Sequence, residues 1–199
     1  MVQSLDVLQE TPSQTAGPYV HIGLIPTHAG NPDYYDHEIG LSPIEDGAQG
    51  EIIEISGSVY DGTGWALRDA VIESWQPDAA GKFATQEGAD PKVSGYCRFA
   101  ADAESGEFTL RTVKPGRVGS RYGVMQAPHI SLWIVARGIN IGLQTRIYFD
   151  DEDNAGDPVL SRIEQTPRVQ TLIAKKTSEG QYRFDIRLQG DGETVFLDI

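Results

Sequence analysis

One histidine, His129, stands directly before an apolar run in the segment KPGRVGSRYGVMQAPHISLWI. Metalloenzymes can place two histidines two residues apart on a strand, because side chains at that spacing leave one face toward a single ion. In this sequence the second position is Ser131, whose hydroxyl is a poor replacement for an imidazole. The spacing therefore indicates half of a metal site. It leaves two interpretations of His129 open: a ligand, or a hydrogen-bonded structural residue.

A second residue capable of chemistry, Arg137, closes the same apolar run just before Gly138. Its separation from His129 is even, so the two side chains share a strand face if the strand is regular. The forked donors of a guanidinium match a carboxylate, which makes Arg137 a candidate contact for an anion. The alternative is an ordinary ion pair on the protein surface.

Two further patterns resemble binding loops but fail on spacing. The acidic run Asp150–Asn154 resembles the start of a calcium loop. Aligning Asp151 with the first loop position, however, puts Arg162 where a bidentate glutamate is required, so we expect a solvated loop. The glycines of Gly62–Gly64 are too few to cradle a phosphate, and they predict a turn.

Other conspicuous side chains are expected in the core. Trp75 and Trp133 lie within apolar runs, which favours burial. Cys97 is the only cysteine, so it cannot form an internal disulfide, and we expect a small buried hydrophobe in a reducing compartment.

The composition bounds both the size and the partners of the protein. A length of 199 residues fits one domain, with or without extended arms. The formal net charge of −13 disfavours nucleic acid and anionic membranes as partners. An anionic ligand would therefore need a local group of basic residues. Residues 1–10 lack the features of a signal peptide, and no run approaches a membrane span, so we expect a cytoplasmic protein.

The first fifty residues differ from the rest of the chain. They are rich in Gly, Pro and Thr, carry Tyr19, Tyr34 and Tyr35, and hold no helical or alternating period. A segment this aromatic is unlike a solvated linker. We interpret residues 1–50 as an irregular arm that lies along a protein surface.

From residue 51 onward the pattern predicts an all-β domain, a β-sandwich over residues 51–199. Short strand-like runs are separated by glycine turns, and one short helix is expected near Thr166, with Val169, Leu172 and Ile173 at helical spacing. The final segment alternates, and its GDG turn predicts a hairpin into a C-terminal strand. The expected strands are EIIEISGSVYDG, AVIESWQPDAAG, EFTLRTVKPG, ISLWIVARG, LQTRIYFDD and YRFDIRLQGDGETVFLDI.

Taken in order, several segments resemble the intradiol ring-cleaving dioxygenases over nearly the whole chain. They include ETPSQTAGPYVHIG, ESWQPDAAGKF, TLRTVKPG, APHISLWIVARGIN and TRIYFDDE. The resemblance implies a β-sandwich and the insertion of both atoms of O2 into a catechol. The implied substrate is protocatechuate (3,4-dihydroxybenzoate). The implied product is 3-carboxy-cis,cis-muconate, on the β-ketoadipate route of aromatic breakdown.

The family holds iron(III) with two tyrosines and two histidines. Carried onto this sequence, the four positions fall at Phe83, Val118, His129 and Ser131, so three of the four ligands are missing. The resemblance therefore implies a non-catalytic subunit with a degenerate metal site, in which His129 is structural. Iron(III) would be bound by a catalytic β subunit, the partner of this chain in a large hetero-oligomer.

The resemblance also implies that this chain helps to form the substrate pocket of its partner. The family's Thr-x-Gly-Pro segment falls at Thr15, Gly17 and Pro18, where glycine permits close approach and proline fixes the backbone. Arg137 matches the arginine of ARGIN, the implied contact for the substrate carboxylate. The alternative is an arm that only packs on the partner.

Two rival functions stay open at this point. The first is a stand-alone, metal-free module that binds an aromatic acid. The second is an active homo-oligomeric dioxygenase, which would need Tyr96 or Tyr122 as a replacement ligand.

Overall fold

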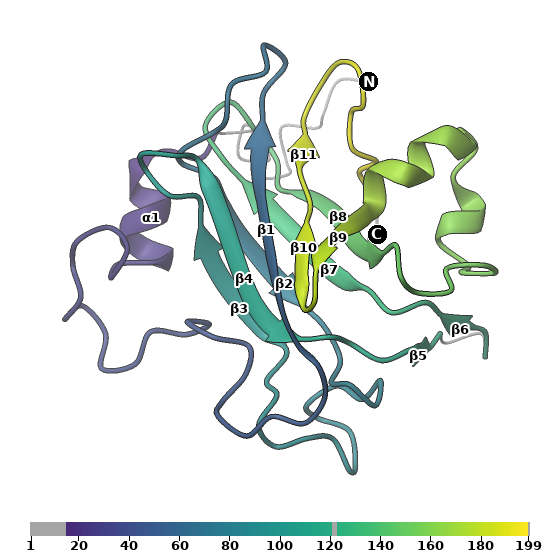
Figure 1. The fold of residues 1–199 in the computed structure, drawn as a ribbon. Helices are drawn as coiled ribbons and strands as arrows, with labels where there is room; N and C mark the ends of the chain where they lie inside the picture. The colour runs from purple at the N-terminus through teal and green to yellow at the C-terminus, as the bar shows by residue number, and fades with distance from the viewer. Residues whose placement is uncertain (1–14, 121–122, 199) are drawn as a thin grey trace, which may run out of the picture.

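A computed structural model describes residues 15–120 and 123–198 (Figure 1). Strands dominate it, with one α-helix and two 3₁₀ helices. The elements are α1 (Pro18–Leu24), β1 (Ile52–Tyr60), β2 (Val71–Trp75), β3 (Tyr96–Ala100), β4 (Glu107–Val113), β5 (Val118–Gly119), β6 (Met125–Gln126), β7 (Ile130–Val135), β8 (Leu143–Phe149), η1 (Leu160–Arg162), η2 (Thr166–Leu172), β9 (Ile173–Ser178), β10 (Gln181–Arg183) and β11 (Ile186–Arg187).

The large sheet is mixed and folds back on itself. Its hydrogen-bonded order is β11-β1-β10-β9-β8-β7-β2-β3, with β4 beside β1, while β5 and β6 form a separate pair. The rings of Phe99 on β3 and Phe108 on β4 lie 5.7 Å apart although their strands are not neighbours in that order. The two ends of the sheet therefore face each other across a shared core, as the predicted sandwich requires (Figure 1).

Alternating burial builds this core. Along β7 the even-numbered residues are buried and the odd-numbered residues face outward, the period expected of a strand with one solvated face. The segment around β10 and β11 alternates in the same way, as predicted, although Leu188 at its end is only partly buried. Buried inward residues include Ile130, Leu132 and Ile134 of β7 and Tyr182, Phe184 and Ile186 near the C-terminus.

The helices differ from the sequence prediction. The predicted helix near Thr166 forms as the 3₁₀ helix η2, but Gln165 rather than Thr166 precedes it, and Ile173 already begins β9. Helix α1 was not predicted, because its seven residues are too few to display a helical period. It lies within the expected irregular arm, which is therefore partly helical.

The strand predictions are mostly confirmed, with one error and four omissions, of which β5 and β6 are only two residues long. The predicted C-terminal strand is absent from the described residues; the backbone after Gly192 runs alongside Gln144, where the Leu197 N–H donates to the Gln144 carbonyl at 2.8 Å. Strands β3 and β9 were missed because short polar stretches hide their alternation.

Both tryptophan predictions were wrong, whereas the cysteine prediction is confirmed. Trp75 and Trp133 sit on the outward face of β2 and β7, and Trp75 is 46% exposed. Cys97 is buried, and burial raises the pKa of its thiol to about 12, which keeps it protonated and unreactive.

Local hydrogen bonds and ion pairs stabilise the two loops whose sequences resemble binding loops, Gly62–Gly64 and Asp150–Asn154. The Asp61 side chain accepts from the Thr63 N–H at 2.8 Å, which forms the predicted turn. The acidic loop is exposed as predicted, but it is also ion-paired: Asp151 lies 3.0 Å from the ammonium of Lys114 and 3.2 Å from that of Lys176.

The described part of the predicted arm, residues 15–50, is fastened to the rest of the chain at several points, one of them at the end of α1. Arg98 of β3 donates from Nη1 to the Leu24 carbonyl at 3.1 Å, which ties the end of α1 to the edge of the sheet. Several large apolar side chains of this segment remain exposed: Tyr19, Ile22, Tyr34, Tyr35, Ile39 and Leu41. Among the described residues, no helix is long and apolar enough to cross a membrane.

Candidate functional site

Arg137 lies in the turn that follows β7. The strand ends at Val135, so the regular continuation that would place Arg137 on the face of His129 does not exist, and that prediction was wrong. The side chain is 75% exposed, and its Nε forms an ion pair with Asp69 Oδ2 at 2.9 Å. Taken alone, this is the surface ion pair that the sequence left open as an alternative.

The N-terminal segment meets the same turn. The Gly138 N–H donates to Thr15 Oγ1 at 2.7 Å, which brings the start of the described chain against the residue after Arg137. Gly17 immediately precedes α1 with an extended backbone (φ −123°), and Pro18 is the first residue of the helix. Gly17 and Arg137 line one cavity of about 440 Å³. The structure thus brings Thr15, Gly17 and Arg137 to one place.

The walls of this cavity are unusually rich in titratable groups for such an acidic chain. Besides Arg137 they include Arg68, Asp69, His21 and His28. The two imidazole rings lie 6.2 Å apart. Burial lowers the pKa of His21, and the nearby His28 acts in the same direction while Asp69 opposes it. His21 is therefore held neutral around physiological pH.

Most residues that line this cavity were not predicted from the sequence. Asp69 and Arg68 belong to a turn between β1 and β2, and nothing local distinguishes them from other surface charges. They reach the site because β2 pairs with β7 antiparallel, with Val71 opposite Val135. This register sets the start of β2 beside the end of β7. The closeness of Arg68 and Asp69 to Arg137 depends on this strand pairing, so their spacing in the sequence does not reveal it.

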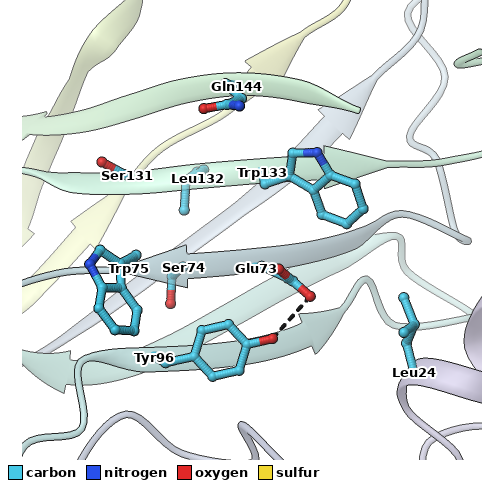
Figure 2. A pocket seen from close by; sticks show the side chains of 9 residues that line it. All are labelled: Leu24, Glu73, Ser74, Trp75, Tyr96, Ser131, Leu132, Trp133 and Gln144. Carbon is cyan, nitrogen blue, oxygen red and sulfur yellow. Dashed lines mark hydrogen bonds between the residues drawn. The ribbon is translucent and has the colours of Figure 1, made fainter. Parts of the chain in front are cut away.

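A second pocket, of about 540 Å³, lies on the outer face of β3, β2, β7 and β8 (Figure 2). Its rings are Trp75, Tyr96 and Trp133. The Oε1 atom of its one carboxylate, Glu73, accepts from the Tyr96 hydroxyl at 2.9 Å and pairs with Arg98 at 2.7 Å. Burial, followed by the hydrogen bond to Glu73, raises the pKa of Tyr96 to about 12. This phenol stays protonated and is a poor metal ligand.

Two of the positions that correspond to the family's iron ligands, Phe83 and Ser131, lie in or beside this second pocket. Phe83 stacks on Trp75, with ring centroids 6.0 Å apart and planes 11° from parallel. Ser131 lies opposite Trp75 in the β2–β7 register. Val118 is buried in the short strand β5. None of these three side chains can replace a phenolate or an imidazole.

His129 has a complete structural environment of its own. Its Nδ1 is 2.8 Å from the Ala127 carbonyl, and its ring packs 5.6 Å from the ring of Tyr148. Burial, with Arg146 as a second cause, lowers the pKa of His129 to about 4. The imidazole is therefore neutral, enclosed and directed at Tyr148, a partner that sequence spacing did not reveal.

The donor set does not fit a ferric ion. Across residues 15–120 and 123–198, no three His, Cys, Asp or Glu side chains gather as a metal cluster would require. Asp157, near His129, accepts instead from the N–H groups of Ala127, Val159 and Leu160 at 2.8–3.0 Å. Tyr122, one of the two replacement ligands considered above, lies outside the described residues.

Comparison with known proteins now settles the family. The sequence profile of the family described as "Dioxygenase" matches residues 27–190. The chain belongs to this dioxygenase family. It is 51% identical over 199 residues to the protocatechuate 3,4-dioxygenase alpha chain of Pseudomonas putida, covering 98% of each chain. It is 30% identical to the protocatechuate 3,4-dioxygenase beta chain of Burkholderia cepacia, covering 80% of this chain and 74% of the other.

Solved structures of dioxygenases share the fold. The 3-chlorocatechol 1,2-dioxygenase of Rhodococcus opacus 1CP superposes with a TM-score of 0.59 at 22% identity, covering 73% of this chain and 63% of the other. An intradiol ring-cleavage dioxygenase from Tetranychus urticae gives 0.54 at 16% identity, with 77% and 88% covered. At this identity the likeness establishes the intradiol dioxygenase fold, which confirms the predicted fold class.

Proposed function

We propose that this chain is the α subunit of a protocatechuate 3,4-dioxygenase. The observation that carries the proposal is the end-to-end identity of 51% to a protein of that name. The assembly cleaves protocatechuate with O2 to 3-carboxy-cis,cis-muconate in the β-ketoadipate pathway. We expect it in the cytoplasm, where the single buried thiol of Cys97 stays reduced.

In this proposal the iron(III) belongs to the β subunit. The support is chemical: Phe83, Val118 and Ser131 cannot ligate it, and His129 is enclosed against Tyr148. Ring cleavage therefore takes place in the partner chain of a large hetero-oligomer. The 30% identity to a beta chain supports a common origin of the two subunits.

The contribution of this chain is a wall of the substrate pocket. Arg137 supplies a positive charge for the substrate carboxylate, which offsets the repulsion of a chain with a formal net charge of −13. Thr15 holds the arm against the turn that carries Arg137. A Cβ added at Gly17 would meet nothing within 4 Å among the described residues, so the backbone at Gly17 is free to face a ligand or the partner. Pro18, the next residue, begins α1.

The exposed apolar side chains of residues 15–50 fit the same role. Tyr34, Tyr35, Ile39 and Leu41 are each roughly half exposed or more, a cost that a partner surface removes. We therefore propose that residues 1–50 are an arm that packs on the β subunit and that residues 51–199 form the sandwich domain.

Reconstitution tests this function. The chain is purified alone, the β subunit is purified alone, and protocatechuate-dependent O2 uptake is measured for each and for the mixture, with the product identified. We expect uptake and 3-carboxy-cis,cis-muconate from the mixture. Turnover by this chain alone would support the homo-oligomeric alternative. Binding of protocatechuate by the lone chain, with no stimulation of β, would support the stand-alone module instead.

A further inference from the structure

We propose that Asp69 is a positioning residue of the carboxylate-binding site. It holds the Arg137 side chain by Nε and leaves the two terminal nitrogens of the guanidinium for the ligand. The inference rests on the function proposed for Arg137 and deepens it, since it assigns the residue that makes this arginine selective for a carboxylate.

The contact atoms carry the argument. The ion pair joins Arg137 Nε to Asp69 Oδ2 at 2.9 Å. Within the described residues, no hydrogen bond joins the terminal nitrogens of Arg137 to another group. Those nitrogens form the end of the guanidinium fork, which can meet a carboxylate with two parallel N–H···O bonds. The internal partner thus occupies the side of the fork and leaves its end open.

The fold explains why Asp69 can do this. The turn at Arg68 and Asp69 precedes β2, and the turn at Arg137 and Gly138 follows β7. The antiparallel β2–β7 register, with Val71 opposite Val135, fixes these two turns side by side. The carboxylate of Asp69 therefore reaches Arg137 from a turn that the sheet holds in place, and not from residues 15–50.

Arg137 needs such a partner because little else restrains it. The side chain is 75% exposed. Arg137 lies in a turn, in which the next residue, Gly138, has a positive φ of 86°. A long, exposed arginine loses rotamer freedom when it binds a ligand. A residue that holds the guanidinium in place beforehand lowers that loss and strengthens binding.

The second oxygen of Asp69 shows that the arrangement is not optimised for stability. Asp69 Oδ1 is shielded from solvent and has no hydrogen-bond partner among the described residues. A buried, unsatisfied carboxylate oxygen is unfavourable, and such atoms concentrate at functional sites. The other charged or titratable groups of the cavity wall, Arg68, His21 and His28, surround this pair without forming an ion pair with Asp69.

Asp69 has two opposing effects on the binding of a carboxylate ligand, and their relative size decides whether its removal weakens or strengthens binding. Its negative charge partly cancels that of Arg137 and should weaken attraction of an anion. Because the Arg137 side chain is 75% exposed, water and salt screen that long-range repulsion. The geometric effect is not screened, so we expect removal of Asp69 to weaken binding of the carboxylate.

The test uses the complex reconstituted from this chain and its β partner. Four variants are compared with the native complex: Asp69→Asn, Asp69→Glu, Arg137→Ala and the double variant Asp69→Asn/Arg137→Ala. Glu107→Gln is the matched control, because it removes the carboxylate from an ion pair with Arg183 at 3.0 Å elsewhere on the surface. KM and kcat are measured for protocatechuate, and catechol, which lacks the carboxylate, is titrated as a competing ligand.

We expect Asp69→Asn to raise KM for protocatechuate roughly three- to tenfold with little change in kcat. Inhibition by catechol should be unchanged, Asp69→Glu should recover part of the loss, and the double variant should resemble Arg137→Ala alone. Thermal unfolding of each complex checks that the assembly is intact. Glu107→Gln should behave as the native complex.

Distinct results overturn distinct claims. If Arg137→Ala raises KM but Asp69→Asn leaves it unchanged or lowers it, the positioning role is wrong and the proposed function stands. Additive effects in the double variant, or an equal loss of catechol binding, would also overturn the positioning role. If Arg137→Ala itself leaves KM unchanged, the carboxylate contact is wrong, and the role of Asp69 is wrong with it.

Discussion

Two pockets of similar size on one sheet differ in what their polar groups do. In the outer-face pocket, one carboxylate oxygen of Glu73 accepts from Tyr96 and pairs with Arg98, and Phe83 stacks on Trp75 where the family has an iron ligand. The buried hydroxyl of Ser74 in the same wall has no hydrogen-bond partner among the described residues. In the pocket at the end of β7, the fork of Arg137 is open and an oxygen of Asp69 lacks a partner. The contrast between the pockets is therefore one of charge: the carboxylate of the first is paired with Arg98, whereas no hydrogen bond among the described residues engages the terminal nitrogens of Arg137 in the second.

Under the proposed function, the two pockets have different roles. Phe83 and Ser131, in or beside the outer-face pocket, cannot replace a phenolate or an imidazole. The pocket at the end of β7 keeps charge and open space in a chain whose formal net charge is otherwise strongly negative. We therefore assign structure to the first and ligand recognition to the second.

The largest expected effect is on the pH dependence of folding stability, and it tests the structural role that we assign to His129. Its pKa of about 4, against 6.5 for an unperturbed histidine, means that the folded chain resists protonation while the unfolded chain accepts it. The contribution of the neutral His129 to the free energy of unfolding is therefore fully present above about pH 6.5, and it is lost as the pH falls toward 4. The full loss is about 3 kcal/mol.

Chemical denaturation between pH 7.5 and pH 4.5, on the native chain and on His129→Gln, measures this loss. The native chain should lose stability more steeply on acidification than the variant, because the variant lacks the titrating group. Parallel curves would show that His129 is already protonated or exposed in the folded chain.

The next largest effect concerns the open pocket. Arg137→Ala should raise KM for protocatechuate in the complex by roughly 10- to 100-fold, the usual range for losing a charge-assisted bidentate contact. Binding of catechol, which carries no carboxylate, should change little. Steady-state O2 uptake with both compounds measures the contrast, and Arg137→Lys should recover only part of the loss, since an ammonium lacks the fork.

A smaller effect is expected at Gly17. The backbone there is extended and an added Cβ meets nothing in this chain, so Gly17→Ala should change the stability of the free chain by less than about 0.5 kcal/mol. In the complex the added methyl meets the ligand or the partner, and KM should rise a few-fold. Thermal unfolding of the chain and kinetics of the complex separate the two effects. A destabilised free chain would mean that Gly17 is required by the fold itself.

The smallest effect is expected at the outer-face pocket. Trp75→Phe keeps an aromatic ring beside Phe83, and Trp75 is already 46% exposed, so stability should stay within about 0.5 kcal/mol of the native value. Neither KM nor kcat of the complex should move. A large kinetic effect would place function in the pocket that we assign to structure, and it would reverse the comparison.

Sequence reasoning recovered the fold where its periods were clean. Turns such as Asp61–Gly64 and alternating runs such as β7 were predicted, because local hydrogen bonds and one buried face determine them. It failed for α1, which is too short to show a period, and for Trp75 and Trp133, because an apolar strand does not reveal which of its faces is covered.

The candidate sites divide in the same way. Arg137 could be singled out by its place at the end of an apolar run, and Gly17 because a family resemblance pointed to it. Asp69 could not, since only the β2–β7 register brings its turn to Arg137. The enclosure of His129 by Tyr148 likewise depends on the pairing of β7 with β8, which no local spacing encodes.

The iron content of this chain tests the central claim most directly. The chain is refolded with iron in the absence of β, dialysed, and assayed for bound metal, and the same is done for the reconstituted complex. We predict no iron above background in the lone chain and iron in proportion to β in the complex. Stoichiometric iron in the lone chain would contradict the account, and would mean that ligands other than Phe83, Val118, His129 and Ser131 hold a metal here.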